Sequence, residues 1–188
     1  MKKWLILGTL LIAGALTSCG LEFGFKQYYH VNLSPDMWGF EIDNQGRIIV
    51  VGNQAQVLAA PGAPEGQLER IEVHYYDGAG QEIDVGDSTY VANFPVPIPA
   101  GIVCPSAEGG TTFCTKADEN WEYGWARSEP FEFSLDGKIA QMMAAALGSN
   151  ADHIDWHARA IFYARTSGGK PVRWEQDIKI IVPLSSGG

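Results

Sequence analysis

The 188-residue sequence has few cysteines, few basic residues and no apolar run long enough to cross a membrane. Its 13 Lys and Arg residues are outnumbered by 22 Asp and Glu residues, which gives a formal net charge of −9. Such an acidic chain lacks the basic surface with which proteins bind nucleic acid or anionic lipid headgroups. Its main apolar stretch, residues 4–15, is shorter than the roughly 20 residues that a transmembrane helix needs. The composition therefore argues against a nucleic-acid-binding domain and against a plain transmembrane anchor.

Motifs for common catalytic chemistry are also missing. The sequence contains no recognisable phosphate-binding glycine loop and no pair of carboxylates that could be placed together as an acid and a base. The segment 77–84 does not match a calcium loop, because Ala79 and Gln81 occupy positions that need oxygen ligands. We therefore predict no catalytic residues, no cofactor and no enzymatic activity.

The segment Gly-Asp-Ser-Thr at 86–89 superficially resembles the nucleophile block of GDSL-type hydrolases. In that family the Ser attacks the substrate, and an Asp placed three residues before a late His completes the catalytic set. Here Asn150 stands three residues before His153, and Ile154 stands three residues before His157. Since the required Asp is absent at both places, we interpret 86–89 as a turn with local backbone hydrogen bonds.

The first twenty residues have the order of an export signal. Lys2 and Lys3 precede the apolar stretch, and small residues follow it, as in the successive regions of a secretory signal peptide. The segment ends in Leu16-Thr17-Ser18-Cys19, which resembles the lipobox of bacterial lipoproteins. The resemblance implies that the Cys19 thiol receives a diacylglyceryl group and that the signal peptide, residues 1–18, is removed.

A lipidated Cys19 would make the protein an exported, membrane-anchored lipoprotein. Each buried CH₂ contributes about 0.8 kcal/mol, so the two or three acyl chains of a lipoprotein cysteine make release slow. In this family an Asp after the Cys favours retention in the inner membrane, and here that residue is Gly20. We therefore expect the outer membrane if the cell has two membranes, with residues 19–22 as a short lipidated tether.

The mature chain has the size of one domain and two remaining cysteines. Removal of residues 1–18 leaves 170 residues (188 − 18) and 11 basic residues (13 − 2), for a net charge of −11. Cys104 and Cys114 then most simply form a disulfide in an exported protein. A metal site would need further His or Cys ligands nearby, and the segment between the two cysteines has none.

Residues 23–184 are predicted to form one mainly β domain. Apolar residues alternate with polar ones in most segments, and Gly, Asn and Asp residues mark the turns between them. One helix of about 137–147 is predicted, with Asp136 as its N-cap and Gly148 after its end. The expected strands and hairpins lie at 23–33, 38–51, 68–85, 88–94, 131–135, 154–166 and 171–183.

The strand pattern is typical of a β-sandwich. The chain from residue 154 onward resembles the final strand pair of immunoglobulin-like and fibronectin-III-like domains, by pattern and not by motif. We therefore expect an antiparallel immunoglobulin-like β-sandwich with one short helix. Two features depart from that family: the cysteines are too close in sequence for its inter-sheet disulfide, and the loop 95–130 is elaborated.

The segment His-Ile-Asp-Trp-His places His153, Asp155 and His157 on one face of a strand, opposite Trp156. Imidazole and carboxylate groups are suitable ligands for zinc and other transition metals. Residues i and i+4 of a strand lie roughly 13 Å apart, however, so both His side chains could bind one ion only at a bulge. The alternative is the solvent face of a half-buried strand, and we predict no metal.

Trp121, Tyr123 and Trp125 would lie on one face of a strand. If exposed, such a ladder could stack on sugar rings or on a protein partner. We expect the three rings to be mostly buried, because most large aromatic side chains are. The segment follows the Cys104–Cys114 loop, and loops carried by a rigid sandwich are common recognition sites, so this region is the predicted binding surface.

The sequence thus predicts a membrane-anchored envelope lipoprotein that acts as a non-catalytic binding or assembly module. Its partners would be the membrane, through the N-terminal lipid, and an envelope protein or a glycan. One alternative is carbohydrate binding through the aromatic ladder, and another is a metal-binding or hydrolytic role. The oligomeric state stays open, because the one-sided terminal strand could pair with a second molecule at a sheet edge.

Overall fold

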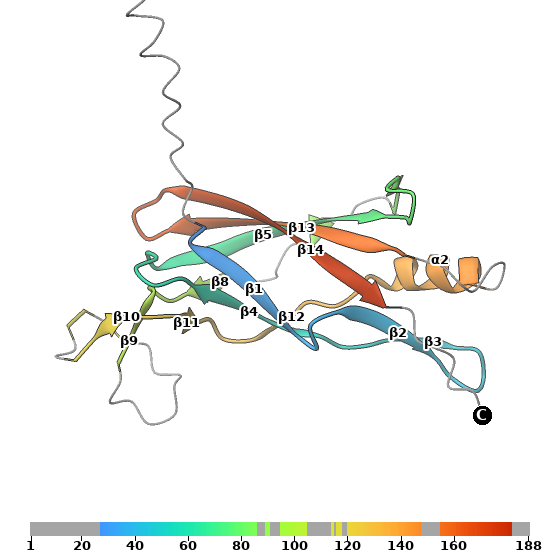
Figure 1. Cartoon of the computed structure of the whole chain (residues 1–188), viewed down its shortest axis with the longest axis horizontal. Helices are drawn as coiled ribbons and strands as arrows, with labels where there is room; N and C mark the ends of the chain where they lie inside the picture. Colours follow the sequence, from blue (N-terminus) through green and yellow to red (C-terminus); the bar gives the residue numbers. More distant parts are fainter. Residues whose placement is uncertain are drawn as a thin grey trace, which may run out of the picture.

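The computed structural model describes residues 27–85, 89–90, 95–104, 114, 116–117, 120–147 and 155–181. These residues form a mainly β structure with one short helix (Figure 1). None of the helices in the described ranges is long and apolar enough to cross a membrane. The elements are β1 (Tyr29–Ser34), β2 (Trp38–Ile42), β3 (Ile48–Val50), β4 (Gln54–Ala59), β5 (Gly66–Tyr76), β6 (Glu82–Ile83), β7 (Thr89–Tyr90), β8 (Val96–Ile98), β9 (Ile102–Val103), β10 (Glu122–Tyr123), β11 (Ala126–Arg127), β12 (Phe131–Glu132), α2 (Gly137–Leu147), β13 (His157–Thr166) and β14 (Pro171–Ile181).

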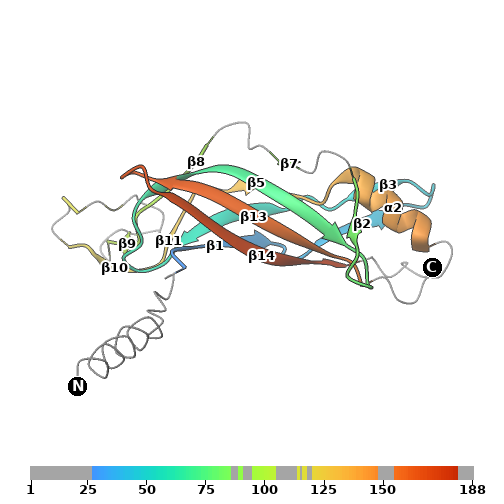
Figure 2. The ribbon, with the colours of Figure 1, turned by 90° about the horizontal axis from the view of Figure 1, so that it is seen from above.

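The larger sheet has the strand order β3-β2-β14-β13-β5-β6, and β7 and β8 also pair with β5. Its three long strands, β5, β13 and β14, run antiparallel side by side along the length of the molecule (Figures 1 and 2). The expected sandwich was wholly antiparallel, but β2 pairs with β14 in parallel, through Ile180 opposite Trp38. The chain reaches this position because β1 and β2, separated by three residues, join different sheets.

The smaller sheet has the order β1-β4-β11, with β12 also paired to β4. It packs across from the long strands, and both sheets contribute side chains to one core. Tyr29, Val31 and Leu33 of β1 are buried while the residues between them are exposed, which confirms the predicted alternation over 29–33. The expected start at residue 23 is wrong for residues 27 and 28, which precede the strand, and residues 23–26 lie outside the described ones. The aromatic centre of the core contains Tyr29, Trp38, Phe40, Phe133, Phe162 and Trp174.

The predicted hairpins are confirmed, with one irregularity. Residues 38–51 form β2 and β3, residues 68–85 include β5 and β6, and the chain from 157 to 181 forms the long β13–β14 pair. Leu68 and Ile71 are both buried although they are three residues apart, because a bulge opposite Tyr163 and Ala164 shifts the register of β5. Such a bulge places two residues of one strand opposite one residue of its partner.

The inward face of β14 contains one polar residue that joins the two sheets. The Gln176 side chain occupies an inward position between Trp174 and Ile178. Its amide nitrogen donates to the Val31 carbonyl (2.8 Å), and its carbonyl oxygen accepts from the Val31 N–H (3.1 Å). The Gln176 side chain therefore supplies hydrogen-bond partners for the N–H and the carbonyl of Val31, which have no strand partner on the side of β1 that faces β14.

The helix has the predicted bounds. Oδ1 of Asp136 accepts hydrogen bonds from the N–H groups of Lys138 (2.7 Å) and Ile139 (3.4 Å), as an N-cap does. The spacing of Ile139, Met142 and Met143 along the sequence predicts that all three face the core, but Met142 is 41% exposed, whereas Ala140 is fully buried. The buried side of the helix is thus rotated toward Ile139, Ala140 and Met143.

Candidate binding surface at the β9–β10 end

The predicted loop 95–130 contains short strands that build one end of the molecule. β8 pairs with the start of β5, β9 pairs with β10, and β11 pairs with β4. The β9–β10 pair is antiparallel, with Ile102 opposite Tyr123 and Val103 opposite Glu122. Ile102 is buried and fixes β9 against the domain, so the pair is a small extension of the fold with one anchored strand.

Gly101 is the residue that joins this extension to the turn between β4 and β5. Its N–H donates to the Ala63 carbonyl (2.8 Å), and its carbonyl accepts from the N–H groups of Gly62 (2.9 Å) and Gly124 (3.2 Å). A Cβ at position 101 would overlap the Ala60 carbonyl. Only glycine allows this approach of two backbones, so the position of β9 depends on it.

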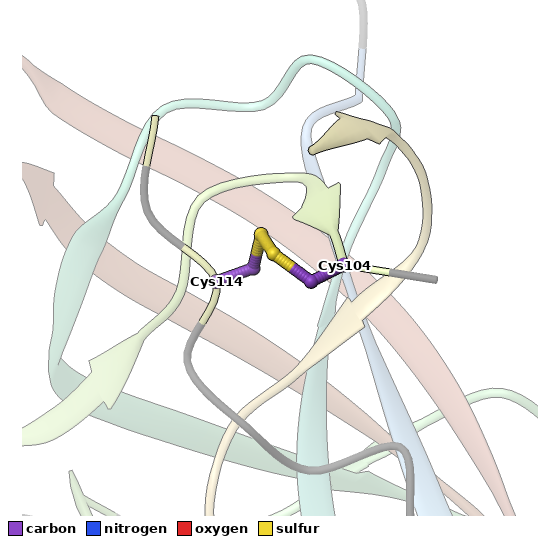
Figure 3. Close-up of a disulfide and its surroundings, with 2 residues drawn as sticks. All are labelled: Cys104 and Cys114. Atoms are coloured by element: carbon purple, nitrogen blue, oxygen red, sulfur yellow. A yellow bond between two sulfur atoms is a disulfide. The ribbon is translucent and has the colours of Figure 1, made fainter. Parts of the chain in front are cut away.

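The predicted disulfide is confirmed at the same end. Cys104 directly follows β9 and is bonded to Cys114, with a Cα–Cα distance of 5.5 Å (Figure 3). The bond returns the chain to β9 before it continues toward β10. Just beyond Cys114, the Lys116 ammonium lies 5.5 Å from the centroid of the Trp121 ring.

The aromatic residues that follow are more exposed than expected. Tyr123 is 61% exposed and Trp125 is 59% exposed, while Trp121 is half-buried. Burial was predicted for all three, and this is wrong for Tyr123 and Trp125. The reason is local: β10 and β11 have two residues each, and the strand is interrupted between Tyr123 and Ala126. Trp125 therefore lies between strands and not on the face of one.

The rings of Trp121 and Tyr123 contact each other edge to face. Their centroids are 5.3 Å apart and their planes are inclined by 78°, an arrangement that aromatic pairs favour. A Cβ at Gly62 would lie 3.6 Å from Cδ1 of Tyr123, so this ring rests against the β4–β5 turn. We refer to Trp121, Tyr123 and Trp125 as the aromatic end.

The aromatic end lies where the described chain begins. The carbonyl of Tyr28 accepts a hydrogen bond from the Ala60 N–H (2.8 Å), in the same turn that Tyr123 contacts. The Tyr29 hydroxyl donates to the Pro64 carbonyl (2.8 Å), and burial raises the pKa of Tyr29 to about 12. In both views, the start of β1 and the β9–β10 pair are at one end, and α2 and β3 are at the other (Figures 1 and 2).

The other predicted site residues are separated or lie outside the described residues. Cys19, His153 and the turn residues 86–88 belong to the latter group. Asp155 is exposed, and His157 stacks on Tyr76 with centroids 5.2 Å apart. Within the described ranges, no three His, Cys, Asp or Glu side chains come close enough together to hold a metal ion.

The outer face of the long strands holds a charge cluster that the sequence alone did not indicate. Arg70 lies over the Tyr163 ring at 4.1 Å, and the Tyr163 hydroxyl donates to Glu72 (2.6 Å). Arg70 also pairs with Glu72, and Arg173 pairs with Glu175. The alternation of apolar and polar residues in the sequence predicts that these side chains point outward. It does not predict that they contact one another across neighbouring strands. Since each Arg has a carboxylate partner, the cluster is a neutral network and not an anion site.

The aromatic end thus has the properties of a contact surface. Its rings offer flat, polarisable faces that stack on planar or apolar groups, and the glycine and disulfide fix the chain on which they stand. No protein-family model and no curated protein matches this chain. The geometry of Tyr123 and Trp125 is therefore the observation on which a functional proposal can rest.

Proposed function

We propose that this protein is a lipid-anchored envelope protein whose single domain acts as a non-catalytic binding or assembly module through the aromatic end. The observation that supports this best is the exposure of Tyr123 and Trp125, at 61% and 59%, on a structured segment. Large aromatic side chains are usually buried unless a partner covers them. They are also the residue types that dominate binding energy at protein interfaces.

We further propose that the domain is immunoglobulin-like. In that fold strands A, B, E and D form one sheet and strands C, F and G form the other, and no described strand is assigned to D here. Assigning β1, β4 and β12 to A, B and E, and β5, β13 and β14 to C, F and G, reproduces the observed neighbours. The additions to a minimal domain include the β2–β3 hairpin, helix α2 and the β9–β10 pair, so the aromatic end belongs to an added part of the fold.

The anchoring proposal rests on the leader and on where the domain starts. Lys2, Lys3, the apolar stretch and Cys19 have the order of a lipoprotein signal. The described chain begins beside the aromatic end. A lipid on Cys19 would therefore hold this end, and not the α2 end, nearest to the membrane.

A crosslinking pull-down from membranes tests the proposal. The lipidated protein is treated with a reversible crosslinker in its own membranes, purified, and its partners are identified by mass spectrometry. We expect a specific partner to be captured by the wild type and lost in Trp125→Ala and in the unanchored Cys19→Ala variant. Ile49→Ala is the matched control, because Ile49 is 49% exposed on β3 at the opposite end. Equal capture by the Trp125→Ala variant would refute the assignment of this surface.

Carbohydrate binding is the second candidate, and the exposure of Tyr123 and Trp125 supports it as well. Exposed rings stack on the apolar faces of sugars. The test is titration of the protein with cell-wall polysaccharide while its tryptophan fluorescence is recorded. Quenching that disappears in Trp125→Ala but persists in Ile49→Ala would support this candidate, and absence of any spectral change would remove it.

A further inference from the structure

The residue types and the position of the aromatic end are suited to contact with a bilayer surface. It combines two exposed amphipathic rings, Tyr123 and Trp125, with the point at which the described chain begins. Trp and Tyr are the residues that concentrate at membrane–water interfaces, where the ring lies among headgroups and its polar edge reaches water. The three other large apolar side chains that are exposed in the described residues, Ile42, Ile49 and Met142, are aliphatic.

The length of the tether limits how far this end can be from a membrane. From Cys19 to Gln27 there are eight residue steps (27 − 19), which span at most about 28 Å when fully extended. The path from Tyr28 to Tyr123 is short, because Tyr28 bonds to Ala60 and the Tyr123 ring rests against Gly62. An acyl chain on Cys19 would therefore hold the rings within reach of the headgroups.

The charges near the rings favour an interfacial contact over an electrostatic one. Lys116 lies beside Trp121, while Glu122 of β10 and Arg127 of β11 are both exposed. Glu122 and Tyr123 are consecutive in β10, so their side chains leave the strand on opposite sides. This mixture of signs provides no strong attraction to anionic lipids, so ring insertion would supply the contact and added salt would hardly change it.

We propose that Tyr123 and Trp125, with Trp121 behind them, insert into the headgroup region of the membrane that holds the Cys19 lipid. This inference rests on the proposed lipid anchor and names the bilayer interface as the partner of the aromatic end. The contact would fix the orientation of the domain on the membrane. Helix α2 and the β2–β3 hairpin lie at the end opposite the β9–β10 pair (Figure 1), so they would then point away from the bilayer.

Quenching by brominated lipid tests the contact directly. The lipidated protein is reconstituted into phosphatidylcholine vesicles with acyl chains brominated near the headgroup, and its tryptophan emission is compared with that in unbrominated vesicles. Trp38 and Trp174 are buried, which leaves Trp121, Trp125 and Trp156 as the reporters in the described chain. We expect quenching in the wild type, loss of most of it in Trp125→Phe, and full retention in Trp156→Phe.

Trp156→Phe is the matched control because Trp156 lies far from the aromatic end. It directly precedes the start of β13. The other end of β13, where the turn to β14 bonds to the turn before β5, is the end near the aromatic residues. Tyr123→Ser adds a second variant that keeps all reporters; it should reduce the quenching of the remaining rings by weakening insertion. Equal quenching in Trp125→Phe and wild type, or a strong decrease on adding salt, would overturn the inference.

Vesicle flotation separates this inference from the proposed function. If the protein fails to float with vesicles, the lipid anchor itself is refuted and the inference falls with it. If it floats but shows no bromolipid quenching, the anchor stands and the membrane contact is refuted. In that second case, quenching of Trp125 by a glycan, or its capture of a protein, would identify the true occupant of the aromatic end.

Discussion

The long strands and the aromatic end are held in place by different interactions. β5, β13 and β14 have 10 or 11 residues each, and their inward side chains lie in a continuous core. β9 and β10 have two residues each, and the Tyr123 side chain of β10 faces water. The first region is held by burial of apolar surface. The second is held by a glycine contact and a disulfide, which fix the backbone without covering the rings.

This comparison indicates where stability and binding are separated in the molecule. Removing a core side chain should unfold the domain, whereas removing an exposed ring should leave it folded and change only what it contacts. We therefore expect substitutions in the core to lower the free energy of unfolding most. Substitutions at the glycine contact and the disulfide should lower it less, and those at an exposed turn least.

The most damaging substitution is expected at Trp38, which is fully buried. Its Nε1–H donates to the Phe133 carbonyl (2.9 Å), and its ring meets Phe133 edge to face at 4.9 Å. Trp38→Ala should lower the free energy of unfolding by about 3–5 kcal/mol, measured by urea denaturation. The paired variant Trp125→Ala should change it by less than about 0.5 kcal/mol. Comparable losses in the two variants would abolish the distinction between core and aromatic end.

Gly101→Ala should damage the aromatic end through its backbone. The added Cβ would overlap the Ala60 carbonyl, and such overpacking costs about 3 kcal/mol. Gly52→Ala is the control, since nothing lies within 4 Å of a Cβ there. Urea denaturation gives the energies, and exposure of Trp121 to acrylamide reports whether the rings have moved. A Gly101→Ala protein as stable as Gly52→Ala would show that the two backbones do not meet at this point.

Loss of the disulfide should lower the stability of the domain and loosen the aromatic end. Chain-entropy reasoning gives about 2.8 kcal/mol for a closed loop of about 11 residues. The double variant Cys104→Ser, Cys114→Ser should lower the unfolding midpoint accordingly and make Trp121 more accessible to quenchers. Reduction of the wild type should reproduce both changes, because the same bond is lost. A lower midpoint with unchanged Trp121 accessibility would mean that the disulfide stabilises the domain without positioning the rings.

Gln176→Ala should weaken the junction between the two sheets. The substitution leaves the N–H and the carbonyl of Val31 without the partners that Gln176 supplies. Unsatisfied polar groups of this kind cost about 1–3 kcal/mol, and we expect about 2 kcal/mol in urea denaturation. Gln67→Ala, at an exposed position of β5, should have almost no effect. Hydrogen exchange of the Val31 amide gives the local readout, and an unchanged exchange rate would contradict this role.

The mildest change concerns the β2–β3 turn, far from the aromatic end. Hydrogen bonds from the backbone N–H of Arg47, and then from its side chain, lower the pKa of Asp43 from its ordinary value of 3.8. Because the folded-state pKa is depressed, this carboxylate stabilises the hairpin above its ordinary pKa, and the contribution disappears as the pH falls through the depressed pKa. Arg47→Ala should raise the pKa of Asp43 only in part, since the backbone bond remains. An NMR titration of Asp43 measures it, and no change would show that the guanidinium contributes nothing.

The parts of the fold that the sequence predicted correctly are those with a sustained period. The alternation of Ala158, Ala160 and Phe162 in β13, and the N-cap Asp136 of the helix, are local signals that the structure confirms. The parallel pairing of β2 with β14 was missed because strand direction depends on how the chain crosses between sheets. No local pattern around Trp38 encodes that crossing.

The exposure of the aromatic end could not be predicted for a related reason. A Trp-x-Tyr-x-Trp pattern is the same in a buried strand and in an exposed one, and burial depends on whether another layer lies over it. Gly124, between Tyr123 and Trp125, was the available signal that the strand is interrupted. The contact of Gly101 with Ala60 joins residues far apart in the chain, so only the structure reveals it.

Site-specific photo-crosslinking would show whether the aromatic end is the contact surface of an anchored protein. A photo-reactive phenylalanine analogue is placed in place of Trp125 in one protein and in place of Ile49 in another, and both are irradiated in native membranes. We expect adducts with lipid or with one partner from position 125, lost when Cys19 is replaced by Ala, and few from position 49. Adducts from position 49 with none from position 125 would contradict the assignment of the contact surface to the aromatic end.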